Sequence, residues 1–66
     1  MTASELFGDS INAQAATDAV RDVAWQYHMQ PHEILYICLS DDNIRMASAI
    51  RNDVMAAYKT ECQKYG

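Results

Sequence analysis

The stretch INAQAATDAVRDVAWQYHMQP, residues 11–31, decides the fold class of this chain. It has no Gly or Pro before Pro31, and its commonest residue is Ala, which has the highest helix propensity. Four apolar side chains in it recur at spacings of four, three and four residues: Ala16, Val20, Val23 and Tyr27. Such spacing places them on one face of a helix. The sequence therefore predicts an amphipathic helix from Ile11 to His28, close to five turns long.

Pro31 ends this helix and begins the next one. A proline displaces the residue before it from helical backbone angles but itself suits the first turn of a helix. Glu33 falls in that first turn, where exposed N–H groups favour a carboxylate. We expect a short helix over residues 31–39. Ile34–Leu39 is also rich in β-branched and aromatic residues, so a buried strand stays open as an alternative, provided that a second copy supplies its pairing strand.

Towards the N-terminus, Thr2 and Glu5 fit the capping box, in which a hydroxyl and a carboxylate satisfy free backbone N–H groups at a helix start. This motif predicts a short helical turn over residues 3–7. A Gly follows it, and either Asp9 or Ser10 is expected to cap the long helix.

Towards the C-terminus, residues 40–43 read Ser-Asp-Asp-Asn, a cluster of residues that favour helix N-caps. No Gly or Pro occurs from Ile44 to Lys64, so a third helix follows. Two apolar seams run along it. The first seam consists of Ala47, Ile50, Val54 and Ala57, and the second of Ile44, Met55, Tyr58 and Cys62. Because a helix in a simple hairpin needs one apolar stripe, we expect this helix to pack on its own chain and on a second copy.

The fold class predicted is all-α: one small helical domain over residues 1–66, with a long helix, a short helix and a long helix. A chain of 66 residues buries only about 60% of the surface that its unfolded form exposes, so self-association would supply missing apolar burial. We therefore expect a homodimeric helical bundle. Its dimer interface is assigned to the first seam.

Several functional classes are disfavoured. The longest apolar run, Ile34–Leu39, has six residues, whereas a membrane-spanning helix needs about 20. The first residues lack the basic flank and apolar stretch of a secretion signal, so a cytoplasmic protein is expected. We find no phosphate-binding loop, nucleophile elbow or metalloprotease helix, and an enzyme is not expected.

Metal and cofactor sites are not expected either. The side chains that could hold a metal ion are those of His28, His32, Cys38 and Cys62. Pro31 separates the two histidines, and both cysteines lie on apolar faces, where a free Cys behaves as a small hydrophobe. A nucleophilic pairing of Cys38 with either histidine is disfavoured for the same reason.

Charge is distributed unevenly along the chain. Residues 1–42 contain seven acids and one base, for a net charge of −6, and residues 43–66 contain two acids and four bases, for +2. A helix-turn-helix transcriptional regulator that reads DNA is the alternative function, with residues 31–39 and the following helix as its key elements. Asp41-Asp42 would repel phosphates there, and only Arg45 and Arg51 could offset them, so nucleic acid is an unlikely partner.

Exposed aromatic and basic residues point instead to another protein as the partner. Trp25 lies off the apolar stripe of its helix, and Tyr36 lies in a segment too short to bury every side. Tyr, Trp and Arg contribute most of the binding energy at protein interfaces. The partner-binding residues predicted are Trp25, Tyr36, Arg45 and Met46. That Trp25 and Tyr36 only complete the core stays open.

The function predicted is a non-enzymatic interaction module that binds a target protein and modulates or inhibits it by covering a functional surface. Small size, net acidity and the absence of site chemistry are typical of accessory regulators encoded by phages and other mobile elements.

Overall fold

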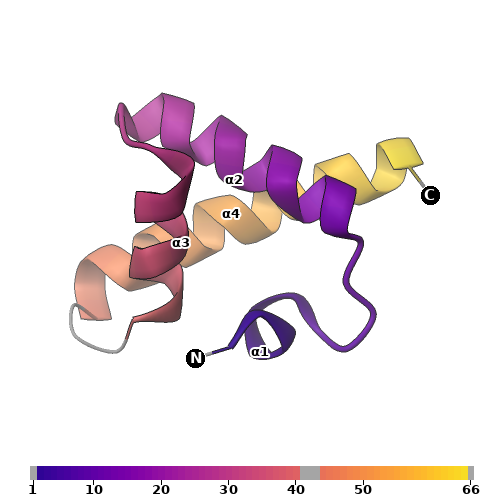
Figure 1. Cartoon of the computed structure of the whole chain (residues 1–66), viewed down its shortest axis with the longest axis horizontal. Coiled ribbons are helices and arrows are strands. Elements are labelled where there is room, and N and C mark those ends of the chain that lie inside the picture. Colours follow the sequence, from indigo (N-terminus) through magenta and orange to yellow (C-terminus); the bar gives the residue numbers. More distant parts are fainter. Residues whose placement is uncertain (1, 41–43, 66) are drawn as a thin grey trace.

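The computed structural model describes residues 2–40 and 44–65, and every regular element in those ranges is a helix (Figure 1). In chain order the helices are α1 (Ala3–Phe7), α2 (Ala13–Tyr27), α3 (Pro31–Leu39) and α4 (Ile44–Tyr65). The all-α prediction is confirmed. The strand alternative for Ile34–Leu39 is wrong, because these residues lie within α3. Ser40 ends α3, and the cap predicted from Asp41–Asn43 lies outside the described residues.

The capping box at α1 is present as predicted. The Glu5 N–H donates to the Thr2 hydroxyl, and the Thr2 N–H donates to the Glu5 carboxylate, each over 3.2 Å. Gly8 then ends the helix at a φ of 90°, a backbone angle that favours glycine. The start of α2 differs from the prediction: Asn12 is the cap, and its side-chain oxygen accepts the Ala15 N–H over 3.1 Å.

The corner between α2 and α3 follows from local chemistry. His28 leaves the helix with a left-handed φ of 56°, and the Met29 N–H closes the turn on the Ala24 carbonyl over 2.9 Å. Pro31 opens α3 as expected, and the Glu33 carboxylate accepts the Gln30 N–H over 3.3 Å. The long helix therefore ends at Tyr27, and the chain turns within three residues.

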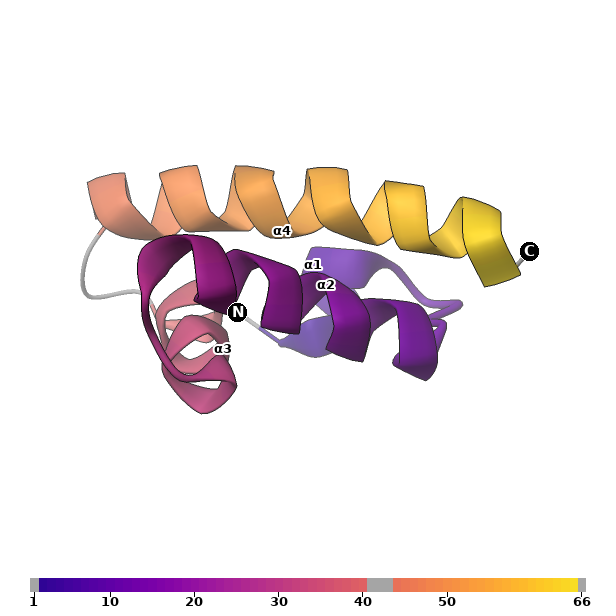
Figure 2. The same ribbon diagram turned by 90° about the horizontal axis from the view of Figure 1, so that it is seen from above.

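Helix α4 runs antiparallel to α2 and extends across the other helices, as Figure 2 shows. Beneath it, α3 packs against both α2 and α4, and α1 contacts α3 and α4. The main core lies where α2, α3 and α4 meet, and its largest fully buried side chains are those of Ile34, Ile50, Val23, Val54 and Cys38. A second cluster joins Ala15 and Ala19 of α2 to Tyr58 of α4.

The seam residues of α4 whose side chains the structure describes pack within one chain. Of the residues assigned to the dimer interface, Ala47, Ile50 and Val54 are at most 1% exposed, and Ala57 packs against the core. In the second seam, Tyr58 is buried, and the half-buried Met55 and Cys62 pack beside it. The sequence interpretation missed this because α4 contacts three helices of its own chain, which requires a wide apolar face. Homodimerisation stays a prediction, and the burial of Ala47, Ile50 and Val54 places these side chains in the core of a single chain.

Two tyrosine–aspartate hydrogen bonds join α2 to α4. The Tyr27 hydroxyl donates to the Asp53 carboxylate, and the Tyr65 hydroxyl donates to the Asp18 carboxylate. In each pair, the hydrogen bond to the aspartate, followed by partial desolvation and the aspartate's charge, raises the pKa of the tyrosine. The neutral phenol is therefore the form that the folded state favours.

These bonds predict a loss of stability at alkaline pH. Because the tyrosine pKa values are higher in the folded state, the stabilisation is complete below about pH 10 and is lost as the pH rises through the folded pKa. Thermal unfolding between about pH 8 and about pH 11 should show a fall in Tm for the native chain. The fall should be smaller in the double variant Tyr27→Phe/Tyr65→Phe. The exposed Tyr36→Phe is the matched control, and equal pH profiles for all three chains would refute the assignment.

Candidate functional site

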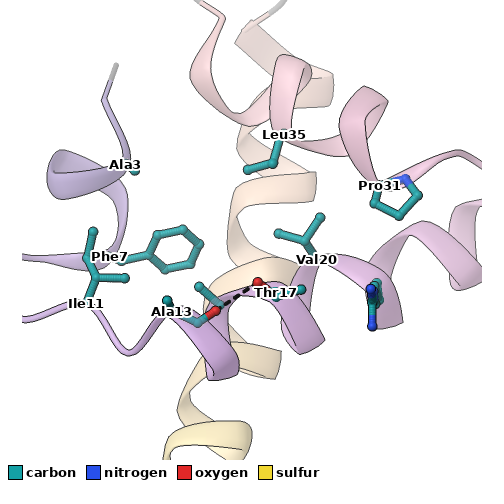
Figure 3. A pocket seen from close by; sticks show the side chains of 10 residues that line it. Ala3, Phe7, Ile11, Ala13, Thr17, Val20, Pro31 and Leu35 are labelled. Atoms are coloured by element: carbon teal, nitrogen blue, oxygen red, sulfur yellow. Dashed lines mark hydrogen bonds between the residues drawn. The ribbon is translucent and has the colours of Figure 1, made fainter.

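An apolar groove of about 420 Å³ opens between α1, α2 and α3, with α4 behind it (Figure 3). This volume lies within the range of about 300–1,000 Å³ that is typical of ligand-sized pockets. Phe7 and Ile11 stand on one side of the groove, and Leu35 and Pro31 on the other. The groove is lined by Ala3, Phe7, Ile11, Ala13, Ala16, Thr17, Val20, Arg21, Pro31 and Leu35.

Tyr58 of α4 holds one wall of the groove in place. Its ring packs on Phe7 with the ring centroids 4.7 Å apart and the planes tilted by 53°. Its hydroxyl also accepts the Asn12 N–H over 3.0 Å. One side chain thus anchors both α1 and the start of α2, and the intervening linker carries Ile11 at the groove. Ile11 and Leu35 keep 37% and 38% of their surfaces exposed, so the groove is open to a partner.

The groove contains little polar chemistry. The Thr17 hydroxyl donates to the Ala13 carbonyl of its own helix over 2.8 Å, the bond drawn in Figure 3. Arg21 is the one charged residue among the described residues that line the groove. The groove therefore offers apolar contact along its length and a single positive charge at the Pro31 end.

Trp25 extends this surface beyond the groove. It is 83% exposed and lines a second hollow of about 560 Å³. Arg21 and Pro31 line both the groove and this hollow, so the two are neighbours. The predicted exposure of Trp25 is confirmed, and the alternative that it completes the core is wrong.

Tyr36 is the other aromatic residue predicted to bind a partner. It is 70% exposed and lines a third hollow of about 320 Å³ with Met29, which also borders the Trp25 hollow. The alternative that Tyr36 only completes the core is therefore wrong as well. We call the groove and these two hollows together the groove face, defined by Ile11, Leu35, Arg21, Trp25 and Tyr36.

The other two predicted partner-binding residues lie elsewhere. Arg45 and Met46 are exposed on the first turn of α4, and neither lines any of the three hollows. Conversely, the sequence analysis did not single out Ile11 or Leu35 for binding. Their only signal was an apolar side chain at a position outside the predicted helical stripes. A binding role for any of these residues stays a prediction.

Arg51, the second cation of the DNA-reading alternative, has a structural partner. Its Nε donates to the Cys38 carbonyl over 2.7 Å and its Nη2 to the Ser40 carbonyl over 2.8 Å. These carbonyls lie at the C-terminal end of α3, where backbone acceptors lack helical partners and a cation is favoured. Arg51 and Arg45 are the two residues predicted to contact phosphate. Among the described residues the structure gives such a bond to Arg51 and shows none for Arg45. Asp41-Asp42, the other part of that hypothesis, lies outside the described residues.

The thiol of Cys38 packs in the core and does not act as a nucleophile. Cys38 is buried, and desolvation raises the pKa of its thiol although the Arg51 charge acts in the opposite direction. It is therefore a neutral thiol near pH 7 rather than a nucleophilic thiolate. Over residues 2–40 and 44–65, no three His, Cys, Asp or Glu side chains gather closely enough to hold a metal ion.

None of the helices in the described part of the chain combines the length and apolar character that crossing a bilayer requires. No protein-family model, curated protein or solved structure matches the chain. The groove face is therefore the basis on which a function can be argued.

Proposed function

We propose that this chain is a non-enzymatic protein-binding module that docks on a target protein through the groove face. The observation that carries the proposal is the 83% exposure of Trp25 beside an open apolar groove. Soluble proteins seldom expose contiguous apolar surface that has no use. Trp and Tyr are also the residues that most often dominate binding energy at protein interfaces.

Docking of this kind would regulate the target by occlusion. An apolar surface with exposed aromatic side chains, such as the groove face, matches the apolar centre of a typical protein interface. Once seated, a domain of 7.4 kDa covers the surface beneath it and blocks other ligands there. The proposed role is that of an accessory regulator, of the kind that phages and mobile elements encode, acting by inhibition or modulation.

The proposal is tested by site-specific photo-crosslinking in nuclease-treated lysate of the source cell. A photoreactive residue replaces Leu35 in one chain and Thr60 in another. Thr60 is the matched control because it is exposed on α4 and its hydroxyl bonds only within its own helix. We expect one dominant protein, at near-equal ratio, captured from position 35 and not from position 60.

Equal capture from both positions would contradict docking through the groove face. Crosslinks to nucleic acid alone, when nuclease is omitted, would overturn the proposal and favour the DNA-binding alternative.

A further inference from the structure

We infer that the occupant of the groove is an amphipathic helix of the partner protein, with apolar anchors on one face and basic residues around them. This rests on the proposed function and specifies its ligand. Three features of the groove lead to it: the absence of a strand edge, the length of the apolar floor, and the sign of the surrounding charge.

The backbone of the module limits how a peptide can bind. Residues 2–40 and 44–65 contain no strand, so a peptide cannot dock there by extending a sheet. Proline-rich segments bind in tracks of aromatic rings, whereas Phe7 is the one aromatic residue among the described residues that line the groove. The common mode that matches a mostly apolar lining with a single charged residue is a helix laid in an apolar groove, with anchors at positions i, i+3, i+4 and i+7.

The length of the groove suits two turns of such a helix. Its floor on α2 runs from Ala13 to Arg21, which corresponds to about 12 Å at the helical rise of about 1.5 Å per residue. Anchors at positions i and i+7 are about 10.5 Å apart on the same measure. Ile11 and Leu35, each more than a third exposed, provide the side walls against which these anchors would pack.

Charge complementarity selects a basic occupant. Each element that borders the groove carries at least one carboxylate: Glu5 on α1, Asp9 in the linker, Asp18 and Asp22 on α2, and Glu33 on α3. None of the five lines the groove, but over residues 2–40 they outnumber the single cation, Arg21, and give this part of the chain a net charge of −4. Lysines or arginines flanking the anchors would be attracted by this field. A cation beside the exposed Trp25 ring would gain a further contact with its π face.

Arg21 makes the inference specific. An occupant that carried a carboxylate would use this guanidinium as its main ionic contact, and the Arg21→Ala variant would then bind it more weakly. A basic occupant gains nothing from Arg21, so the same variant should bind it equally well or more tightly.

The test uses synthetic peptides and the full chain. The basic probe is a Trp-free helical peptide with Leu at positions i, i+3, i+4 and i+7 and Lys on its other faces. Its acidic twin has Glu in place of each Lys, and a scrambled peptide keeps the basic composition without the stripe. Trp25 is the only Trp of the chain, so its fluorescence reports binding at the edge of the groove.

We expect the basic probe to bind about 10-fold or more tightly than either other peptide, with an affinity that falls as salt is added. Leu35→Ser and Ile11→Ser should each weaken binding about 10-fold. Ala56→Ser changes an exposed side chain on α4 that lines none of the three hollows and should keep the native affinity. Arg21→Ala should not weaken binding.

Three results would overturn the inference: equal or tighter binding of the acidic twin, equal binding of the scrambled peptide, or weaker binding of the basic probe by Arg21→Ala. If no peptide binds while position 35 still captures a protein, the basic-helix inference fails and the proposed function stands. If no peptide binds and position 35 captures nothing, both fail.

Discussion

The Val54→Glu variant is expected to be unfolded at room temperature. Val54 has no exposed surface, and it lies in the core with Val23, Ile34 and Ile50. A carboxylate placed there would have no cationic partner, and burying an unpaired charge costs several kcal/mol. A single core of this size supplies only about 3–5 kcal/mol of net stability. Far-ultraviolet circular dichroism should therefore show the loss of most helical signal.

The Ala56→Glu variant is the matched control for this prediction. Ala56 is exposed on the same helix, so the substitution adds the same charge without entering the core. We expect it to keep the native helical signal and a free energy of unfolding within about 0.5 kcal/mol of the native chain. Sedimentation adds a second readout. If the native chain sediments as a dimer and the Val54→Glu chain as a folded monomer, Val54 lies in the dimer interface and not in the core.

The Arg51→Gln variant is expected to lose about 2 kcal/mol of stability, which corresponds to a fall in Tm of about 8–16 °C for a domain of this size. The guanidinium of Arg51 bonds two carbonyls at the end of α3, and glutamine is too short and uncharged to replace both contacts. The partly buried carbonyls would lose a charged donor. Thermal and urea unfolding measure the effect.

The Arg45→Gln variant removes the same charge from the same helix at an exposed position. Its stability should be close to that of the native chain, since surface substitutions usually change stability by less than about 0.5 kcal/mol. Equal stability losses in the two variants would contradict the role of Arg51 at α3. If both variants kept native stability but lost binding to DNA, that result would support the alternative in which Arg45 and Arg51 contact DNA.

Local chemistry made most of the helix bounds predictable. The capping pair Thr2 and Glu5, and the backbone restriction at Pro31, act over a few residues and need no tertiary structure. The cap of α2 was wrong because its choice depends on a distant residue. Asp9, Ser10 and Asn12 are all suitable caps, but the bond from the Asn12 N–H to the Tyr58 hydroxyl fixes the chain at that point.

Tertiary packing explains the other differences. The two seams of α4 were correctly identified as apolar, but their pattern could not show that α2 and α3 lie side by side beneath them. Arg51 looked like a free cation because its partners lie 11 and 13 residues earlier in the chain.

The candidate site was predictable only in part. Trp25 was expected to be exposed because it lies off the apolar stripe of its helix, and Tyr36 because its segment is too short to bury every side. Both side chains are exposed. The groove was not predictable because its walls come from α1, α2 and α3 and close only in three dimensions. Ile11 and Leu35 lie on opposite sides of the groove because Tyr58 holds α1 and the linker in position.

Docking through the groove face is tested most directly by nuclear magnetic resonance of the isotope-labelled full chain mixed with the protein captured from position 35. The largest chemical-shift changes should fall on Ile11, Arg21, Trp25 and Leu35, while the exposed residues Asn52, Ala56 and Thr60 of α4 keep their shifts. Changes concentrated on the outer face of α4, with the groove face unaffected, would contradict the proposed function.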